Sequence, residues 1–199
     1  MYRKFLKRII DFCIALVAMP FMLPITLVVG LAIVVDDRGS VFYLAPRRGL
    51  NGKIFRMIKF RSMKMNAPDI RNSDNSTYNA PDDPRITRVG RIIRSMSVDE
   101  FPQLLNVLIG DMSLIGPRPV TIDRPLEQYD EKRWKRLTVR PGITGYSQAY
   151  FRNSISNEEK LEKDAEYVGN VTFLGDLRII LATIKTVLFH KNIYNAVNK

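Results

Sequence analysis

The sequence contains one cysteine, Cys13, and one histidine, His190, among its 199 residues. A single cysteine excludes a disulfide scaffold and a zinc site built from several cysteines. A single histidine excludes a histidine-rich metal centre and argues against a catalytic triad that uses a histidine base. Any catalysis therefore has to depend on carboxylates, lysines, arginines or a bound metal ion.

Glycine-rich nucleotide-binding motifs are also missing. The glycines at positions 90, 110, 116, 142 and 145 show neither the spacing of a Walker loop nor that of a dinucleotide-binding fingerprint. The sequence thus gives no support for an NTPase or a dehydrogenase. Its 46% of apolar residues are too many for a disordered chain, and its length suits one domain with a real core.

Acidic residues are outnumbered by basic ones, 20 against 31, which gives a formal net charge of +11. Such an excess suits either nucleic acid or a surface that meets anionic lipids and phosphorylated ligands. A basic segment at residues 1–11 is followed by 24 uncharged residues from Phe12 to Val35. A soluble nucleic-acid binder has no use for this apolar run. We therefore expect a membrane as partner, and no nucleic acid.

Two prolines, Pro20 and Pro24, interrupt the apolar run. A straight helix of this length would measure about 36 Å, enough to cross the hydrocarbon core. Each proline removes a backbone donor and clashes with the preceding turn, so we expect the helix to bend or break there. We favour a re-entrant helix that enters and leaves on one membrane face. A kinked spanning helix is the alternative, because membrane helices tolerate proline.

The charge distribution divides the chain into two parts. Residues 1–36 form the basic segment and the membrane helix, and residues 37–199 are predicted to form a cytoplasmic catalytic domain of the α+β class. This domain is expected to be mostly helical, with a short β-hairpin from residues 40–45 and 53–60 around a turn that contains Asn51-Gly52.

The rest of the domain alternates polar loops and helical patterns. Residues 66–85 are polar and contain three prolines, which predicts a long loop and a candidate active-site lid. Helical patterns follow at 86–109 and 157–168. The last helix, at roughly 172–189, carries an amphipathic stripe that favours core packing over membrane contact, although both can hold.

Two adjacent acids, Asp99 and Glu100, open the helical pattern near residue 97. One interpretation is structural: Ser97 and Glu100 match a capping box, whereas Pro102 fits the first turn better if Asp99 is the cap. The other is chemical. An ionised Asp99 is a competent nucleophile that needs no deprotonation.

Three cations are candidates for a phosphate site beside these acids. Lys59 and Arg61 lie two positions apart beside a strand end, and Arg118 lies between two prolines that restrict its backbone. A fixed guanidinium suits bidentate binding of phosphate oxygens. Taken singly, Lys59 and Arg61 also fit a solvated strand edge. Divalent metal with Lys59 and Arg118 would offset the repulsion between Asp99 and a diphosphate, and one or two carboxylates suit Mg²⁺.

Four motifs in order match one known family. They are KFRSM (59–63), DPRITRVGRIIR (83–94), SVDEFPQLLNVLIGDMSLIGPRP (97–119) and RPGITGYSQ (140–148). Behind a basic, proline-broken helix, they resemble the bacterial sugar transferases, the monotopic phosphoglycosyl transferases. The match runs from about Lys7 to Leu188, and DE-x-PQL together with GPRP carries its specificity. We expect the minimal catalytic form, without the N-terminal membrane domain of larger members.

The resemblance implies transfer of a sugar-1-phosphate from a UDP-sugar to undecaprenyl phosphate, with release of UMP. This reaction is the first membrane step of surface glycan assembly at the bacterial inner membrane. Asp99 would be the nucleophile of a covalent intermediate, with Mg²⁺ assisting at Asp99, and Glu100 the second catalytic acid. The family's re-entrant helix also favours the re-entrant reading of Pro20 and Pro24. A homodimer is left open.

The resemblance extends the candidate site to further residues. Lys59 and Arg118 match positions used around the phosphates, and Asp164 matches a recurring acid near the active site, although a solvated helix face explains it equally well. Where many members read V-N-G-R, this chain has Ala149, Tyr150, Phe151 and Arg152. The two aromatic residues suggest a different sugar preference. Arg152 stays aligned with the arginine of the family pattern and is expected to reach the donor phosphates.

Two other function classes stay open from the residues. A membrane-surface scaffold that binds lipid without catalysis needs the basic N-terminus and the apolar helices but not Asp99. A metal-dependent nucleotide-sugar pyrophosphatase uses the same acids and cations but releases free sugar phosphate without an acceptor lipid.

Overall fold

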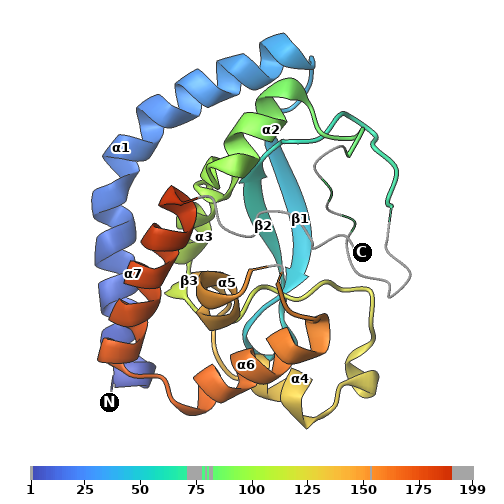
Figure 1. The fold of residues 1–199 in the computed structure, drawn as a ribbon. Coiled ribbons are helices and arrows are strands. Elements are labelled where there is room, and N and C mark those ends of the chain that lie inside the picture. The colour runs from blue at the N-terminus through green and yellow to red at the C-terminus, as the bar shows by residue number, and fades with distance from the viewer. Residues whose placement is uncertain (1, 71–77, 79, 81–82, 153, 190–199) are drawn as a thin grey trace.

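The computed structural model describes residues 2–70, 78, 80, 83–152 and 154–189 (Figure 1). The helices are η1 Tyr2–Leu6, α1 Lys7–Asp36, η2 Leu50–Gly52, α2 Arg88–Ser95, η3 Val98–Glu100, α3 Gln103–Ile109, η4 Leu126–Gln128, α4 Glu131–Arg136, α5 Tyr146–Tyr150, α6 Asn157–Gly169 and α7 Phe173–Leu188. The strands are β1 Phe42–Arg48, β2 Ile54–Phe60, β3 Ser113–Ile115 and β4 Gly142–Thr144. Helices predominate over two short sheets, which confirms the predicted α+β class.

The predicted β-hairpin is present as the antiparallel pair β1 and β2, in which Phe42 lies opposite Phe60. Its turn uses two left-handed residues, Asn51 at φ 55° and Gly52 at φ 76°, as asparagine and glycine allow. Strands β3 and β4 pair in parallel, with Ser113 opposite Gly142. This second sheet was not predicted, because three-residue strands inside turn-rich segments carry no alternating pattern.

Helix α1 continues through both prolines as one helix, and Figure 1 shows it bent along its length rather than reversed. Among the described residues it is the one helix long and apolar enough to cross a membrane. Its middle is largely uncovered by the rest of the chain, with Phe21 and Val28 about 70% exposed. The prolines therefore bend the helix without ending it.

The first turns of α1 are fixed to the domain by ionic and polar contacts. Lys7 Nζ lies 2.6 Å from Asp176 Oδ2 of α7, and Arg8 donates to the carbonyls of Val107 and Leu108 at the end of α3. The buried Asp11 accepts a hydrogen bond from Ser113 of β3.

The last turn of α1 contacts the same domain. Asp36 accepts a hydrogen bond from the Val89 backbone N–H at 2.9 Å, and Ile33 packs in a core cluster with Phe60 and Ile93. A straight helix of 30 residues would separate its ends by about 45 Å. Because α1 bends, its first and last turns both contact one folded domain, while its apolar middle stays exposed.

The two C-terminal helices are confirmed close to their predicted bounds. Helix α6 starts with a capping box between Ser156 and Glu159. Helix α7 buries Ile179 in a core cluster, but the opposite side exposes Phe173, Leu174, Leu177, Leu181 and Ile184. Only part of the apolar face predicted for this helix therefore packs in the core, and the rest is exposed. Half of the predicted loop 66–85 lies outside the described residues, namely 71–77, 79, 81 and 82, so its role as a lid stays a prediction.

Candidate active site

Asp99 and Glu100 lie on η3, a short 3-10 turn between α2 and α3. The turn begins at Ser97, which has a left-handed backbone at φ 57° and makes no capping hydrogen bond. Helix α3 starts only at Gln103, with Pro102 at the N-cap position. Both capping predictions are therefore wrong, because the Glu100 side chain is drawn to cations instead of to the Ser97 backbone.

A buried asparagine fixes α3 against β2. The Asn106 side-chain oxygen accepts from the Ile58 backbone N–H at 2.9 Å, and its amide nitrogen donates to the Arg56 carbonyl at 2.8 Å. Asn106 is 1% exposed, so both bonds are shielded from water. This anchor holds η3 beside the strand that carries Lys59.

Lys59 and Arg118, two of the predicted phosphate-binding cations, both face Glu100. Lys59 Nζ donates to Glu100 Oε1 at 2.7 Å, and an Arg118 guanidinium nitrogen lies 3.6 Å from the same oxygen. The Arg118 side chain is 56% exposed. One carboxylate oxygen therefore holds two cations, one largely buried and one open to solvent.

The two acids differ in protonation. Burial raises the pKa of Asp99 to about 6, with Lys59 and Glu100 acting in opposite directions. Burial also acts to raise the pKa of Glu100, but the charges of Lys59 and Arg118 outweigh it and lower that pKa to about 2. Glu100 is thus ionised throughout the neutral pH range, whereas Asp99 changes its protonation state about one pH unit below neutrality.

The Asp99 carboxylate is the acid that remains available for chemistry. No hydrogen bond or ion pair from the described residues reaches it, while Lys59, Arg94 and Arg118 act on it through charge. A half-buried carboxylate among cations can attack an anionic electrophile that the same cations bind. Arg94, at the end of α2, was missed, although arginines at 88, 91 and 94 recur every three residues in the motif.

Arg152 also lies near the acid pair, while its predicted contact with the donor phosphates stays a prediction. One of its guanidinium nitrogens donates to Ser97 Oγ at 2.9 Å, and its charge acts on Glu100. The two aromatic residues before it cluster with Tyr146, whose ring centroid lies 4.9 Å from that of Tyr150. The Tyr150 side chain is exposed, and the departure from the family pattern directly precedes Arg152 in the chain.

Two predicted site residues have other tasks. Arg61 is buried, pairs with Asp37 and donates to the Ser40 carbonyl at 2.6 Å, which joins β2 to the end of α1. The structure does not bring Arg61 to the acid pair, because all three of its guanidinium nitrogens donate hydrogen bonds to Asp37 and Ser40 at this junction. Its prediction as a phosphate ligand is not met.

Asp164 is buried inside the domain and is not on a solvated helix face. It accepts from Ser147 Oγ at 2.7 Å and pairs with Arg136 at 3.0 Å. Arg136 in turn donates to the Arg118 carbonyl at 3.1 Å. Asp164 therefore braces the loop that presents Arg118, and burial raises its pKa against the effect of Arg136.

The donor set fits a magnesium ion that is shared with phosphates. Among the described residues there is no group of three or more acidic, histidine or cysteine side chains that could hold a metal alone. Asp99 offers one uncommitted carboxylate, since Glu100 is taken by Lys59. Mg²⁺ commonly binds one or two carboxylates and completes its shell with water and substrate phosphates.

Comparison with known proteins agrees with this geometry. The sequence model of the family described as bacterial sugar transferase matches residues 2–190. The sugar transferase EpsL of Bacillus subtilis, named as uncharacterized, is 45% identical over 94% of this chain and 90% of the relative. The exopolysaccharide production protein ExoY of Sinorhizobium fredii is 39% identical over 94% of this chain and 88% of its own.

A longer relative carries a more specific name. The undecaprenyl-phosphate galactose phosphotransferase of Salmonella typhimurium is 37% identical over 96% of this chain, which spans 42% of that relative. The family expected from the motifs is thereby confirmed. This chain belongs to the bacterial sugar transferase family and is an enzyme of its phosphoglycosyl transferase type.

Proposed function

We propose that this protein transfers a sugar-1-phosphate from a UDP-sugar to undecaprenyl phosphate and releases UMP, through a covalent intermediate on Asp99. The observation that carries the proposal is the division of labour between the two acids. Glu100 holds Lys59 at 2.7 Å, whereas Asp99 lies among the same cations and meets no hydrogen bond or ion pair from the part of the chain that the structure describes. Relatives named undecaprenyl-phosphate glucose and galactose phosphotransferases support this acceptor.

In the first step, an Asp99 carboxylate oxygen attacks the phosphorus that bears the sugar. A P–O bond forms, the phosphoanhydride bond breaks, and UMP leaves with the bridging oxygen. Lys59, Arg94 and Arg118 offset the charge on the transferring phosphate. A magnesium ion bound by Asp99 and the donor phosphates would reduce the repulsion between the two anions.

In the second step, a phosphate oxygen of the lipid attacks the same phosphorus and the Asp99–phosphorus bond breaks. The product is a lipid diphosphate sugar, and the Asp99 carboxylate is restored. Glu100, with a pKa of about 2, does not serve as a base in this scheme. Its task is to position Lys59 and Arg118, which revises the role that the resemblance implied.

The membrane arrangement belongs to the same proposal. Both ends of α1 contact one domain through Lys7–Asp176 and Asp36–Val89, so a re-entrant helix with the domain on the cytoplasmic face accounts for the exposed apolar middle. A polyprenyl phosphate presents its headgroup at that interface, within reach of a half-inserted enzyme.

The test is UMP release from a panel of UDP-sugars with Mg²⁺, with and without undecaprenyl phosphate, for wild type and Asp99→Asn. We expect sustained release with one sugar that requires the lipid and disappears in the variant. Sustained release without lipid would indicate a pyrophosphatase instead. Release that Asp99→Asn retains would remove Asp99 as nucleophile.

A further inference from the structure

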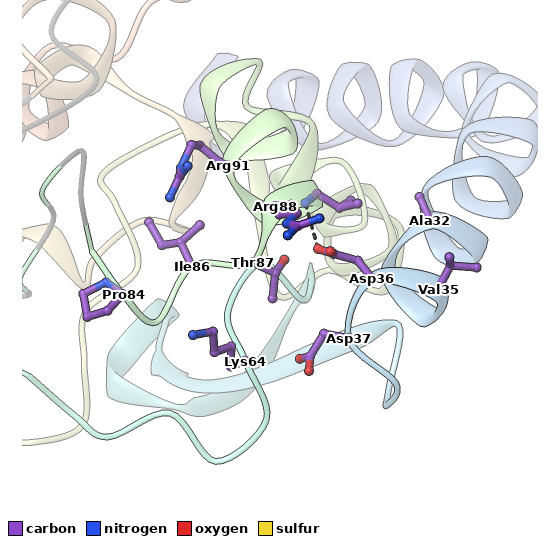
Figure 2. A pocket seen from close by; sticks show the side chains of 11 residues that line it. Ala32, Val35, Asp36, Asp37, Lys64, Pro84, Ile86, Thr87, Arg88 and Arg91 are labelled. Atoms are coloured by element: carbon purple, nitrogen blue, oxygen red, sulfur yellow. Dashed lines mark hydrogen bonds between the residues drawn. The ribbon is translucent and has the colours of Figure 1, made fainter.

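An open hollow of about 990 Å³ lies between the last turn of α1 and the start of α2 (Figure 2). It is separate from the acid pair, because neither Asp99 nor Glu100 lines it. Figure 2 shows Ala32 and Val35 projecting from α1 at one edge of this hollow, with basic side chains across from them. We call it the interfacial hollow.

Three cations give the interfacial hollow its charge. Lys64, Arg88 and Arg91 line it, and all three are exposed. No hydrogen bond or ion pair from the described residues reaches their side-chain nitrogens. The two acids at its edge are already engaged, because Asp36 accepts from the Val89 N–H and Asp37 pairs with Arg61. The hollow therefore presents unpaired positive charge to a ligand.

The hollow lies where the apolar surface of α1 ends. Leu31 and Val35 are 68% and 76% exposed, and they are followed at once by Asp36, Asp37 and Arg38. The end of an apolar segment marks the level at which a helix leaves the hydrocarbon region. In the proposed membrane arrangement, on which this inference rests, Lys64, Arg88 and Arg91 lie at the depth of the lipid headgroups, where basic side chains meet anionic lipids.

We propose that the interfacial hollow binds one anionic membrane phospholipid. Its phosphate contacts Lys64, Arg88 and Arg91, and its acyl chains lie along Ala32 and Val35. Neither acid of the pair lines this site, and binding there does not depend on the transfer reaction. Because α2 runs for eight residues from Arg88 toward Ser95, about 12 Å, a bound lipid also steadies the helix that leads to the acid pair.

The test compares two triple variants with the same loss of three positive charges. The first is Lys64→Gln/Arg88→Gln/Arg91→Gln. The matched control is Lys53→Gln/Arg56→Gln/Arg124→Gln, whose residues are also exposed but lie near the turn end of the β-hairpin. Delipidated protein in detergent is titrated with phosphatidylglycerol or phosphatidylcholine of the same acyl chains, and bound lipid is counted by native mass spectrometry.

We expect wild type and the control variant to retain one phosphatidylglycerol at a concentration at least tenfold below that needed for phosphatidylcholine. The first variant should lose this preference to within about twofold. Equal loss in both variants would show a diffuse charge effect and overturn the site. Retained preference in the first variant would overturn it as well.

Two competitors separate the lipid from other phosphates. Inorganic phosphate at millimolar concentration should leave the phosphatidylglycerol bound, and its displacement would indicate a site for free phosphate. Undecaprenyl phosphate should displace the phospholipid no better than phosphatidylglycerol itself. Stronger displacement would assign the hollow to the acceptor.

A folding control accompanies these titrations: both triple variants should have melting temperatures within a few degrees of wild type. Single substitutions of Arg88 and Arg91 should each weaken phosphatidylglycerol binding by less than the triple variant does.

Discussion

The Arg152 guanidinium donates a hydrogen bond to Ser97 Oγ at 2.9 Å, and both residues have a left-handed backbone, at φ 49° and 57°. A non-glycine residue in that region costs about 1–2 kcal/mol. Ser97 lies two positions before Asp99, and its contact with a second left-handed residue indicates strain that the surrounding structure maintains at the site. This contact ties the loop after α5 to the turn that carries the acids.

Substitution of Ser97 separates strain from hydrogen bonding. Ser97→Gly relieves the backbone and removes the bond to Arg152, whereas Ser97→Ala removes the bond and keeps the strain. We expect Ser97→Gly to be about 1 kcal/mol more stable than Ser97→Ala in denaturant unfolding. Both should lose about tenfold in kcat/KM for the donor, because Arg152 is no longer positioned. Full activity in Ser97→Gly would mean that Arg152 does not need Ser97.

The contact between Glu100 and Lys59 predicts a strong coupling. Glu100→Gln should reduce kcat/KM for the donor by about 10- to 100-fold, because Lys59 and Arg118 lose the anion that places them. A double-mutant cycle with Lys59→Met should give a coupling free energy of about 1–3 kcal/mol.

A surface pair supplies the control for that cycle. Lys132 lies 2.5 Å from Glu162, with both side chains more than half exposed, and such pairs contribute little. Glu162→Gln should leave kcat/KM unchanged. Additive effects of Glu100→Gln and Lys59→Met would contradict the positioning role.

The pKa of about 6 for Asp99 predicts the pH dependence of the first step. Asp99 attacks as the carboxylate, so at sub-saturating Mg²⁺ the single-turnover rate of UMP release without acceptor should rise about tenfold per pH unit below 6 and level off above 7. Saturating Mg²⁺ should move this inflection to lower pH, because a bound cation stabilises the carboxylate. Measuring this step alone avoids the titration of the lipid phosphate. Glu100, at about 2, should add no inflection above pH 4.

The raised pKa of Asp99 also predicts how the stability of the protein depends on pH. The folded state binds the Asp99 proton more tightly than the unfolded chain, so the free energy of unfolding should fall as pH rises from about 4 to 6. Asp99→Asn should remove this contribution. A single-turnover rate that stays flat between pH 5 and 7 at sub-saturating Mg²⁺ in wild type would contradict the environment described for Asp99.

The bent helix predicts that both of its ends are accessible from one side. In a Cys13→Ser background, needed because Cys13 is exposed, single cysteines at Lys4 and Ser40 should react with a membrane-impermeant maleimide only when the cytoplasmic face is open. Inverted and right-side-out vesicles provide the comparison. Labelling of the two positions from opposite faces would support a spanning helix.

Local patterns predicted the acid pair, the β-hairpin and the two C-terminal helices. Asp99, Glu100, Lys59 and Arg118 share a motif set whose spacing matches a known family, and the structure brings all four together. Hairpin turns and amphipathic helices depend on residues close in sequence, which is why Asn51-Gly52 and the α7 stripe were informative.

Long-range partners could not be predicted in the same way. Arg61 follows β2 and turns toward Asp37, 24 positions earlier, and no local signal distinguishes this pairing from a phosphate contact. Asp164 acts on Arg118 through Arg136, a relation that exists only once α4 and α6 have packed. The β3–β4 pair depends on close backbone approach at Gly116 and Gly142, which a linear pattern does not reveal.

The most direct test of the account is to trap the intermediate. Protein is incubated with Mg²⁺ and the UDP-sugar that supports turnover, without acceptor lipid, and its intact mass and peptide masses are measured. We predict one equivalent of UMP and a sugar-phosphate adduct on the peptide that contains Asp99, lost when undecaprenyl phosphate is added and absent in Asp99→Asn. Turnover with the lipid but no adduct, or an adduct that persists in Asp99→Asn, would contradict the account.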